Sequence, residues 1–234
     1  MGAMAAGLAH EVKNPLSTMS LNLQLMAEDF ADPKTPVEER TLRRAKLLLG
    51  EVERLDGIVH DFLSLARGYE IEPEVVDLEL LLTQLVSFTE PEHQRLGIAV
   101  RTSFTPSARF VVAVPKYLHL ALLNLVVNAQ QALEDVDEPQ LFVETRDRGD
   151  FAEVRITDTG PGIPPEKIEK IFMPFWSSKS AGTGLGLPTT RRIVEECGGD
   201  IRVQTAPGHG TRFIVSLPKV PKALPGGTDG ETSR

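Results

Sequence analysis

The sequence predicts an α+β protein in which a helical hairpin is followed by an α/β sandwich with a mixed sheet. Three observations carry this prediction. In the first third of the chain, apolar residues recur at spacings of three and four, which is typical of helices that pack along a seam. Beyond residue 68, helical periods alternate with the period of two that marks strands. The length of 234 residues, of which 41% are hydrophobic, suits one large domain or two small ones.

The first predicted helix carries one apolar seam, and a proline-rich turn ends it. The seam residues recur at alternating spacings of four and three: Ala5, Ala9, Val12, Leu16, Met19, Leu23, Met26 and Phe30. The segment Asp32–Pro36 interrupts the pattern because it contains two prolines. A second helix is expected over residues 42–66, where a stripe beside its own seam widens the apolar face.

This apolar face is broader than one partner helix can bury. We therefore expect two copies of the chain to close a four-helix bundle, which makes the protein a homodimer through its helical hairpin. The alternative is a hairpin that packs against another part of the same protein.

The second region combines helices and strands in mixed order. Helices are expected over residues 77–90, 116–133 and 188–196, and strands over residues 98–104, 109–114, 141–146, 152–157, 201–205 and 211–217. A Gly/Pro-rich loop separates the fourth of these strands from the last helix. Such an order predicts a mixed sheet layered on helices.

A break in the helical pattern at Gly68–Pro73 marks the domain boundary. Residues 1–67 are then the helical hairpin, and residues 68–218 are the sandwich. Residues 219–234 are expected to be a disordered tail because they offer little apolar surface to bury.

Composition excludes several classes of protein. The chain has 25 basic and 33 acidic residues, a formal charge of −8, and no basic block, so we expect no nucleic-acid partner. The single cysteine, Cys197, excludes a disulfide framework and suits a reducing compartment. The longest stretch without a charged side chain, residues 117–133, is too short and too polar to span a membrane, so we expect no membrane contact by this chain.

Two asparagines, Asn124 and Asn128, share one face of the helix expected over residues 116–133 because they are four residues apart. Buried amides need polar partners, and amide oxygens suit a magnesium ion that keeps some of its waters. A pair of structural asparagines explains the same spacing, and this motif alone favours that explanation.

The end of the strand expected over residues 152–157 carries a second motif, Asp158–Pro164. A carboxylate at Asp158 is able to accept a hydrogen bond from an exocyclic amine such as that of adenine. Gly160 and Gly162 permit a positive φ and close approach of the backbone. An ordinary turn at the end of a strand accounts for the motif equally well.

A third motif precedes the last predicted helix and contains Gly182, Thr183, Gly184, Leu185 and Gly186. Glycines there expose backbone N–H groups, and the start of a helix favours phosphate. The motif is neither a P-loop nor a dinucleotide fingerprint, because it lacks the lysine of the first and the preceding strand of the second.

Together and in this order, the three motifs resemble the N, G1 and G2 boxes of the Bergerat ATP-binding fold over residues 70–218. Between the last two, Ile171–Trp176 resembles the F box of histidine kinases. The resemblance implies that Asn128 ligates Mg²⁺ with support from Asn124, and that Asp158 reads adenine. The stretch from Gly162 to Gly182 is then the ATP lid.

The same resemblance gives roles to three residues of this lid. It implies that Phe172 and Phe175 anchor the lid to the core, although both also suit ordinary core aromatics. Family members often carry a basic residue just before the G2 box, where this chain has Lys179. Lys179 would then help to neutralise phosphate charge; a solvated lysine is the alternative.

The first predicted helix contains His10, Glu11 and Asn14, followed by Pro15. His10 lies just off the apolar seam, and a neutral imidazole there is a competent nucleophile near neutral pH. Pro15 removes a helical N–H and is expected to loosen or bend the helix beyond the histidine. The sequence His-Glu-Val-Lys-Asn-Pro-Leu resembles the H box of the phosphoacceptor domain of two-component sensor histidine kinases.

That resemblance implies a complete reaction. His10 attacks the γ-phosphate of Mg-ATP, Glu11 acts as a base or orients the ring, and the phosphoryl group passes to an aspartate of a response-regulator receiver domain. The His-Glu-x-x-Asn pattern also matches members that dephosphorylate the regulator, with Asn14 placing the attacking water. A solvated helix face is the alternative for Glu11 and Asn14. The chain is then the catalytic core of a longer bacterial protein, located in the cytoplasm.

Two departures from the family pattern are present. Gln130 and Gln131 stand where many members have a basic residue, and Ala113–Pro115 stands where an acidic residue is frequent. Neither removes a required group. A gyrase-like ATPase has neither the H box nor the F box, and an inactive scaffold would not need the intact His10. The sequence therefore favours a histidine kinase.

Overall fold

The computed structural model describes residues 2–66, 73–177 and 183–221, without the side chains of residues 2–13, 53, 54 and 56–66. The chain divides into two compact units. One contains residues 1–70 and 169–192, and the other contains residues 71–168 and 193–234.

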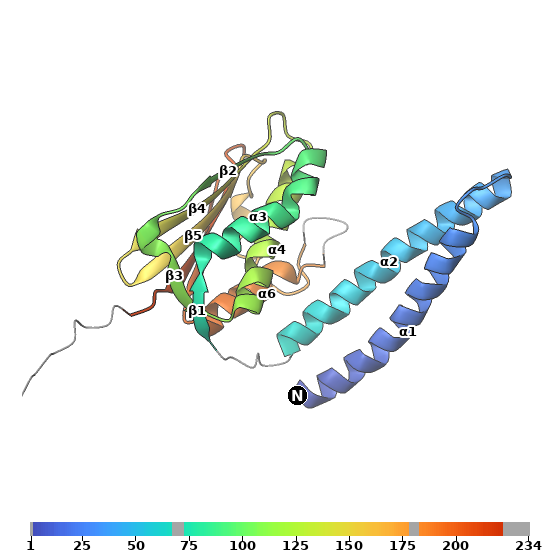
Figure 1. Ribbon diagram of the computed structural model, residues 1–234, viewed down its shortest axis with the longest axis horizontal. Helices are drawn as coiled ribbons and strands as arrows, with labels where there is room; N and C mark the ends of the chain where they lie inside the picture. The colour runs from blue at the N-terminus through green and yellow to red at the C-terminus, as the bar shows by residue number, and fades with distance from the viewer. Residues whose placement is uncertain (1, 67–72, 178–182, 222–234) are drawn as a thin grey trace, which may run out of the picture. The chain divides into compact units, whose positions relative to one another are not determined.

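The first unit contains the helical hairpin, with α1 at Gly2–Asp29 and α2 at Pro36–Ala66 (Figure 1). The turn between them is where the prolines predict it, and its hydrogen bonds start α2. The backbone N–H of Glu38 donates to Thr35 Oγ1 at 3.3 Å, and Glu38 Oε2 accepts from the backbone N–H of Thr35 at 3.3 Å. This reciprocal arrangement is a capping box, which satisfies N–H groups that a helix start leaves without partners.

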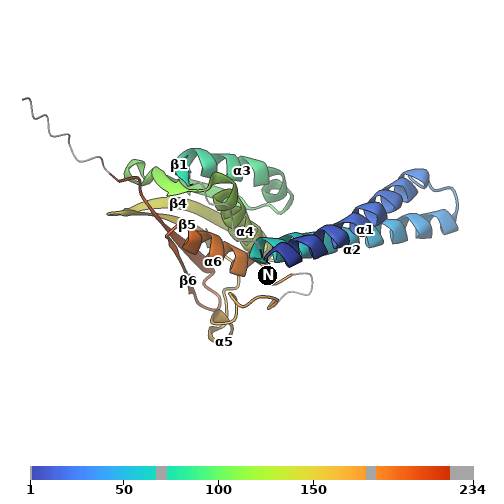
Figure 2. The same cartoon turned by 90° about the horizontal axis from the view of Figure 1, so that it is seen from below.

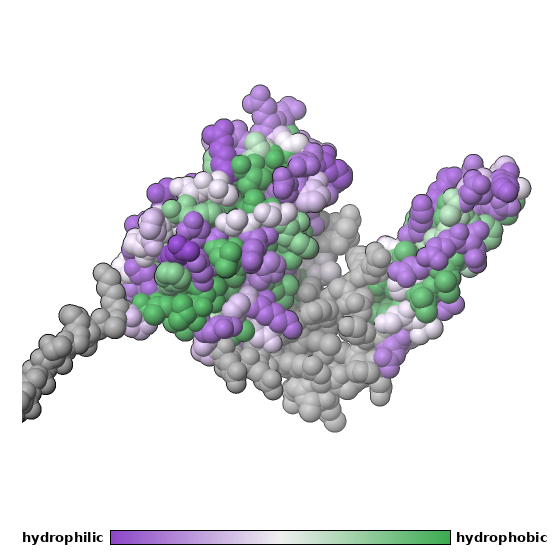
Figure 3. Space-filling model, viewed as in Figure 1, coloured by the Kyte–Doolittle hydropathy of each residue, from purple (hydrophilic) through white to green (hydrophobic). Residues whose placement is uncertain are grey.

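Much of the described apolar surface of this hairpin is uncovered in a single chain. Leu16 and Ala45 are buried. Eight other apolar side chains are between 43% and 67% exposed: Met19, Leu21, Leu25, Met26, Val37, Leu47, Leu48 and Leu55. Figure 3 shows hydrophobic side chains among hydrophilic ones along the hairpin. A face of this kind calls for a further partner.

The second unit is built on a mixed sheet of five strands in the order β2-β4-β5-β7-β6. The strands are β2 at Ala99–Ser103, β4 at Gln140–Arg148, β5 at Phe151–Asp158, β6 at Asp200–Thr205 and β7 at Thr211–Pro218. Strands β2 and β4 are parallel and the other pairs are antiparallel, so the predicted mixed sheet is confirmed.

Helices cover one face of this sheet (Figures 1 and 2). They are α3 at Leu78–Arg95, α4 at Pro115–Leu133 and the carboxyl half of α6, whose bounds are Gly186–Glu196. Alternate side chains of β4 and β5 point toward the helices, and the largest of them are fully buried. The core therefore lies between the helices and one face of the sheet: Leu82, Leu85, Leu118, Leu122, Leu125, Leu141, Ile156 and Leu217.

Three short elements were not predicted from the sequence. Strand β1 at Glu74–Asp77 pairs in antiparallel fashion with β3 at Phe110–Ala113, and the pair forms a separate sheet. A 3-10 turn at Pro106–Ala108 and the short helix α5 at Pro165–Ile168 also lie in segments assigned to loops. Elements of three or four residues are too short to show a period.

Helix α3 is longer than predicted because it continues through Pro91 to Arg95. The Thr89 hydroxyl donates to the carbonyl oxygens of Leu85 at 2.9 Å and Val86 at 3.2 Å, in the turn before the proline. They lie one turn before the helical bond that Pro91 removes, which is the one to the Ser87 carbonyl. The start is also shifted, since Asp77 lies outside the helix as its N-cap.

Beyond β7 the chain stays hydrogen-bonded for two residues. Lys219 Nζ donates to Asp147 Oδ1 at 2.8 Å, and the backbone N–H of Val220 donates to the Phe110 carbonyl at 3.3 Å. The ordered chain thus enters the segment expected to be disordered from residue 219; residues 222–234 of that segment lie outside the described residues. Among the described helices, none is long and apolar enough to cross a membrane.

Candidate active site

The N-box asparagines lie where the sequence predicts, on α4. Asn124 and Asn128 are both partly exposed, whereas Leu125 and Val126 beside them are fully buried. The amides therefore share a face turned away from the core, and their oxygens suit Mg²⁺, which accepts few protein ligands and keeps several waters. Among the described residues, no group of three or more His, Cys, Asp or Glu side chains forms a metal cage.

Asp158 ends β5 with its carboxylate buried, only 4% of the residue being exposed. Its Oδ1 accepts hydrogen bonds from the backbone N–H groups of Gly160 at 2.9 Å and Thr211 at 3.2 Å. A carboxylate is held firmly by such charge-assisted bonds. The side chain is thus oriented by two segments of the fold, as a group that selects a ligand must be.

Both G1 glycines are required by close approach of the backbone. A Cβ at Gly160 would lie 2.8 Å from Asp158 Oδ1 and 2.9 Å from the Ala132 carbonyl oxygen of α4. Gly162 has φ of 72°, and a Cβ there would overlap the Ala206 carbonyl. The G1 loop therefore packs against the end of the N-box helix on one side and against the turn after β6 on the other.

That turn was not singled out from the sequence, yet it holds the G1 loop in place. Thr205 Oγ1 accepts from the Ile163 N–H at 2.9 Å and donates to the Gly210 carbonyl at 2.8 Å. The Gly208 N–H donates to the Pro161 carbonyl at 2.8 Å. In the sequence this turn is marked only by Gly208-His-Gly210-Thr at the start of a strand. That pattern indicates an ordinary hairpin turn and no contact with the G1 loop.

The described part of the G2 box, Thr183–Gly186, lies at the start of α6 in the other compact unit. The helix begins at Gly186, two residues earlier than the predicted start at Pro188. Thr183 Oγ1 accepts from the Leu185 N–H at 3.3 Å, and Leu185 is fully buried. The start of a helix exposes N–H groups that attract anions. Lys179 and Gly182 lie outside the described residues.

The F-box phenylalanines differ in their surroundings. The Phe172 ring lies 3.8 Å from the guanidinium carbon of Arg191, a cation–π contact. Phe175 is 64% exposed and has φ of 64°, which excludes the alternative that it is a core aromatic. Its backbone N–H donates to the Gly184 carbonyl at 3.0 Å, so the F box is bonded to the G2 box.

The H-box residues belong to α1. The side chains of His10 and Glu11 lie outside the described part of the structure. The Asn14 side chain is exposed, and its carbonyl accepts a hydrogen bond from Thr18 Oγ1 at 3.1 Å. The helix continues through Pro15 without a break.

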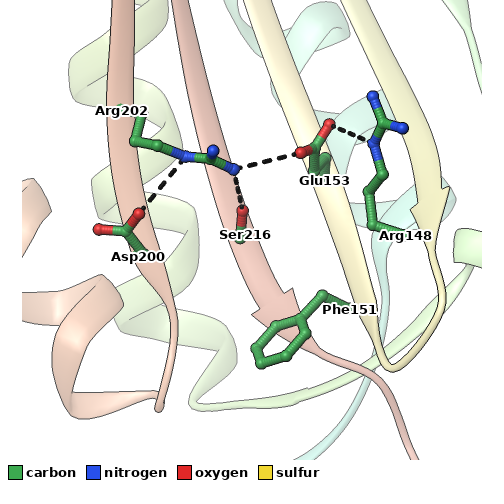
Figure 4. Close-up of a pocket in the computed structure, with 6 residues that line it drawn as sticks. All are labelled: Arg148, Phe151, Glu153, Asp200, Arg202 and Ser216. Atoms are coloured by element: carbon green, nitrogen blue, oxygen red, sulfur yellow. Dashed lines mark hydrogen bonds and ion pairs between the residues drawn. The ribbon is translucent and has the colours of Figure 1, made fainter.

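A separate cleft of about 480 Å³ lies on the sheet (Figure 4). It is lined by Arg148, Phe151, Glu153, Asp200, Arg202 and Ser216. Glu153 and Asp158 are five residues apart on one strand, so their side chains point to opposite faces. None of the residues singled out from the sequence lines this cleft, and ion pairs link its charged side chains.

Cys197 is the only cysteine in the sequence. It is partly buried, and burial raises the pKa of its thiol. Because the thiolate is the reactive form of cysteine, a raised pKa lowers the reactivity of this thiol near neutral pH.

The arrangement of β5, α4 and the G1 loop is that of an ATP-binding sandwich, and comparison with known proteins agrees. The family described as "Histidine kinase-, DNA gyrase B-, and HSP90-like ATPase" matches residues 113–221. The family described as "His Kinase A (phospho-acceptor) domain" matches residues 1–69. The two matched ranges follow each other in the order that the H box and the ATP-site boxes predict.

Individual proteins give the same result. Sensor histidine kinase ZraS of Salmonella typhimurium is 33% identical over 221 residues, which are 94% of this chain and 46% of ZraS. The catalytic domain of histidine kinase ThkA is 30% identical, with a TM-score of 0.58 over 64% of this chain and 97% of that one. Histidine kinase ThkA in complex with response regulator protein TrrA is 27% identical, with a TM-score of 0.65 over 94% and 62% of the two chains.

The chain therefore belongs to the histidine kinase family, with a phosphoacceptor domain followed by an ATPase domain. It spans about half the length of the sensor kinase ZraS.

Proposed function

We propose that this chain is the catalytic core of a two-component histidine kinase, which transfers the γ-phosphoryl group of ATP to His10. One observation carries the proposal. A single chain of this family contains both the H-box residues and an ATP-binding fold in which the buried Asp158 carboxylate accepts two backbone hydrogen bonds. The exposed apolar side chains of the hairpin support a homodimer, in which two hairpins form a four-helix bundle. The proposed domains are residues 1–67 and residues 68–218, with a tail from residue 219.

The proposed reaction is an in-line displacement. A ring nitrogen of His10 forms a bond to the γ-phosphorus, the bond from that phosphorus to the bridging oxygen breaks, and ADP leaves with the electron pair. Glu11 takes the ring proton or orients the imidazole through its other nitrogen. Because phosphoryl transfer depends on positioning and on charge neutralisation, the protein's main task is to hold both partners in line.

The nucleotide would be held by residues of the four boxes. Asp158 accepts a hydrogen bond from the adenine amine, and its two N–H bonds keep the carboxylate in place. The backbone N–H groups at the start of α6 and the side chain of Lys179 bind phosphate oxygens. Phe172 and Phe175 anchor the segment that leads to the G2 box.

Asn128, with Asn124 beside it, would hold the magnesium ion through an amide oxygen. Bound Mg²⁺ supplies positive charge against the phosphates. This matters because residues 68–218 carry 14 basic and 21 acidic side chains, so the net charge of the domain opposes the nucleotide. Phosphate binding must then rest on local groups.

The second substrate would be a receiver domain of a response regulator, which accepts the phosphoryl group on an aspartate. The similarity to ThkA, which has been solved in complex with response regulator protein TrrA, supports this partner. We further propose that the exposed Asn14 places water for dephosphorylation of the regulator. A cytoplasmic location in a bacterium fits a kinase with such a partner.

The test is incubation of the chain with γ-labelled ATP, followed by acid and base treatment. A phosphohistidine label is lost in acid and kept in base. We expect this label in the wild type and in the control His119→Gln, and its loss in His10→Ala. Label that survives in His10→Ala would overturn the assignment of the phosphoacceptor. ATP binding without any label would instead favour an inactive scaffold.

The phosphatase proposal needs its own measurement. Asn14→Ala should slow release of phosphate from a phosphorylated regulator and leave autophosphorylation of His10 nearly unchanged. Equal losses of both activities would mean that Asn14 acts only on the structure of the helix.

A further inference from the structure

The F box is joined to α6 by an unusually close cation–π contact. Arg191, on the second turn of α6, places its guanidinium carbon 3.8 Å from the centre of the Phe172 ring. The two other described contacts of this kind are much longer, 5.3 Å at Phe110 and 5.9 Å at Phe142. At 3.8 Å the guanidinium lies over the ring, where its planar, delocalised charge differs from the compact ammonium of a lysine.

A second contact lies at the other end of the same two segments. The Phe175 N–H donates to the Gly184 carbonyl at 3.0 Å, and both residues have left-handed backbones, with φ of 64° and 69°. A Cβ at Gly184 would lie 2.6 Å from the carbonyl carbon of Phe175 and from the Trp176 nitrogen. An aromatic residue holds this conformation only where its surroundings enforce it. The approach of Gly184 is what enforces it here.

The two contacts join the F-box segment to the start of α6 at both ends. Phe172 and Phe175 are three residues apart on one side, and Gly184 and Arg191 flank the first turns of α6 on the other. Leu185, directly after Gly184, is fully buried and leaves the G2 turn little freedom. Loss of the contact between Arg191 and Phe172 is therefore expected to loosen the hydrogen bond between Phe175 and Gly184.

We propose that these four residues form a clamp, the F-box clamp, and that Arg191 is a positioning residue for nucleotide binding. Arg191 does not contact the nucleotide; it acts through Phe172 and Phe175 to hold Gly184 and the N–H groups that follow it. This inference rests on the proposed function, since it takes the start of α6 as the phosphate site. It adds a residue that the G2 motif itself does not contain.

The chain carries its own reporter for this clamp. Trp176 is the only tryptophan, it is partly buried, and it directly follows Phe175. Its backbone nitrogen faces Gly184 at close range. Binding of a nucleotide at the G2 turn should therefore change the emission of Trp176, and the change should depend on the stack of Arg191 on Phe172.

The experiment titrates the full chain with ADP and magnesium, followed by calorimetry and by Trp176 fluorescence. We expect Arg191→Ala to weaken ADP binding about threefold to tenfold and to remove most of the fluorescence change. Arg191→Lys should retain only part of the ADP affinity and of the fluorescence change, because it keeps the charge without the planar guanidinium. Lys170→Ala, which removes an exposed cation near the F box, should match the wild type.

Phe172→Leu keeps apolar volume without an aromatic face and should reproduce the loss seen in Arg191→Ala. If the two residues act as a pair, the double variant should lose no more than either single variant. Additive losses, or an Arg191→Ala chain that binds ADP and changes fluorescence as the wild type does, would overturn the clamp. A wild-type chain that does not bind ADP would instead overturn the proposed function, so the two failures are distinguishable.

Discussion

Asp158 and Thr211 are 53 residues apart in the sequence, yet the Thr211 N–H donates to Asp158 Oδ1 at 3.2 Å. The two residues are also directly paired in the antiparallel register of β5 and β7. The sheet itself therefore fixes the direction of this carboxylate. A group held in this way can select a ligand without first being ordered by it.

The first prediction concerns this carboxylate. Asp158→Ala should weaken ADP binding by about 10- to 100-fold, because hydrogen bonds to a charged group contribute roughly 1.5–3 kcal/mol. Calorimetric titration of ADP measures the effect. Asp150→Ala, at the exposed turn between β4 and β5, is the control and should bind as the wild type does. An Asp158→Ala chain with a dissociation constant within twofold of the wild-type value would show that this residue does not read the nucleotide.

The second prediction compares two glycines with a positive φ, of which only Gly162 lies close to another segment of backbone. Gly149 and Gly162 have nearly equal φ values, 71° and 72°, but a Cβ at Gly149 meets no atom within 4 Å. Gly149→Ala should therefore lower the free energy of unfolding by only about 1 kcal/mol, the cost of a strained conformation. Gly162→Ala adds a clash with the Ala206 carbonyl, so it should be less stable and should bind ADP more weakly. Urea unfolding and ADP titration check both variants. Equal losses of stability and ADP affinity in the two variants would show that the Ala206 carbonyl does not restrict Gly162.

The third prediction concerns pH. His93 is 3% exposed, and neither ring nitrogen has a hydrogen-bond partner among the described residues. Burial lowers the pKa of this imidazole, although Glu90 and Glu92 act in the opposite direction. The folded state therefore keeps His93 neutral at a pH where the unfolded chain binds a proton.

Stability should accordingly be lost as the pH falls below about 6.5, by at most about 1.4 kcal/mol per pH unit for this one proton. Urea unfolding at several pH values between 5 and 8 measures it. His93→Leu should flatten the dependence in this range, whereas His209→Leu, at an exposed position, should leave it unchanged. A His93→Leu chain with the wild-type pH dependence would contradict the assignment.

The fourth prediction concerns the cleft on the sheet (Figure 4). Burial disfavours ionisation of Glu153, yet hydrogen bonds from Arg155 and Arg148 outweigh it and hold the pKa of this carboxyl below its ordinary value. The Glu153 side chain is 7% exposed, and that of Arg155, 2.7 Å away, is 17% exposed. Removal of the carboxylate would leave a nearly buried guanidinium without its counter-ion.

Glu153→Ala should therefore lower the free energy of unfolding by about 2 kcal/mol. ADP affinity should not change, because Asp158 points to the other face. Glu144→Ala, which breaks a more exposed pair with Arg146, is the control and should have a much smaller effect. A loss of ADP affinity in Glu153→Ala would mean that the two faces of the sheet are coupled.

Residues with a strong local signal were predicted well. The apolar period of α4 placed Asn124 and Asn128 on one face of a helix, and the alternation in β5 placed Asp158 at the end of a strand. Both positions are confirmed. The prolines at Asp32–Pro36 agree with the observed turn, but α2 begins at Pro36, six residues before the predicted start at residue 42.

Residues whose role depends on distant partners were not found. Thr205 and Thr211 support the G1 loop only because β7 pairs with β5, a relationship that no local pattern encodes. Phe175 has a left-handed backbone that an aromatic residue rarely adopts, and its N–H bonds to Gly184, a contact between segments that no local pattern relates. Strand β1 exists because β3 lies beside it, and its four residues carry no period.

The most direct test of the account is to locate the phosphoryl group after incubation of the full chain with ATP. Peptide mass spectrometry under alkaline conditions, which preserve phosphohistidine, identifies the modified residue. We expect a phosphoryl group on His10 in the wild type and in the His119→Gln chain, a much lower yield in Asp158→Ala, and no phosphohistidine in His10→Ala. A phosphoryl group on another residue, or an undiminished yield in Asp158→Ala, would contradict it.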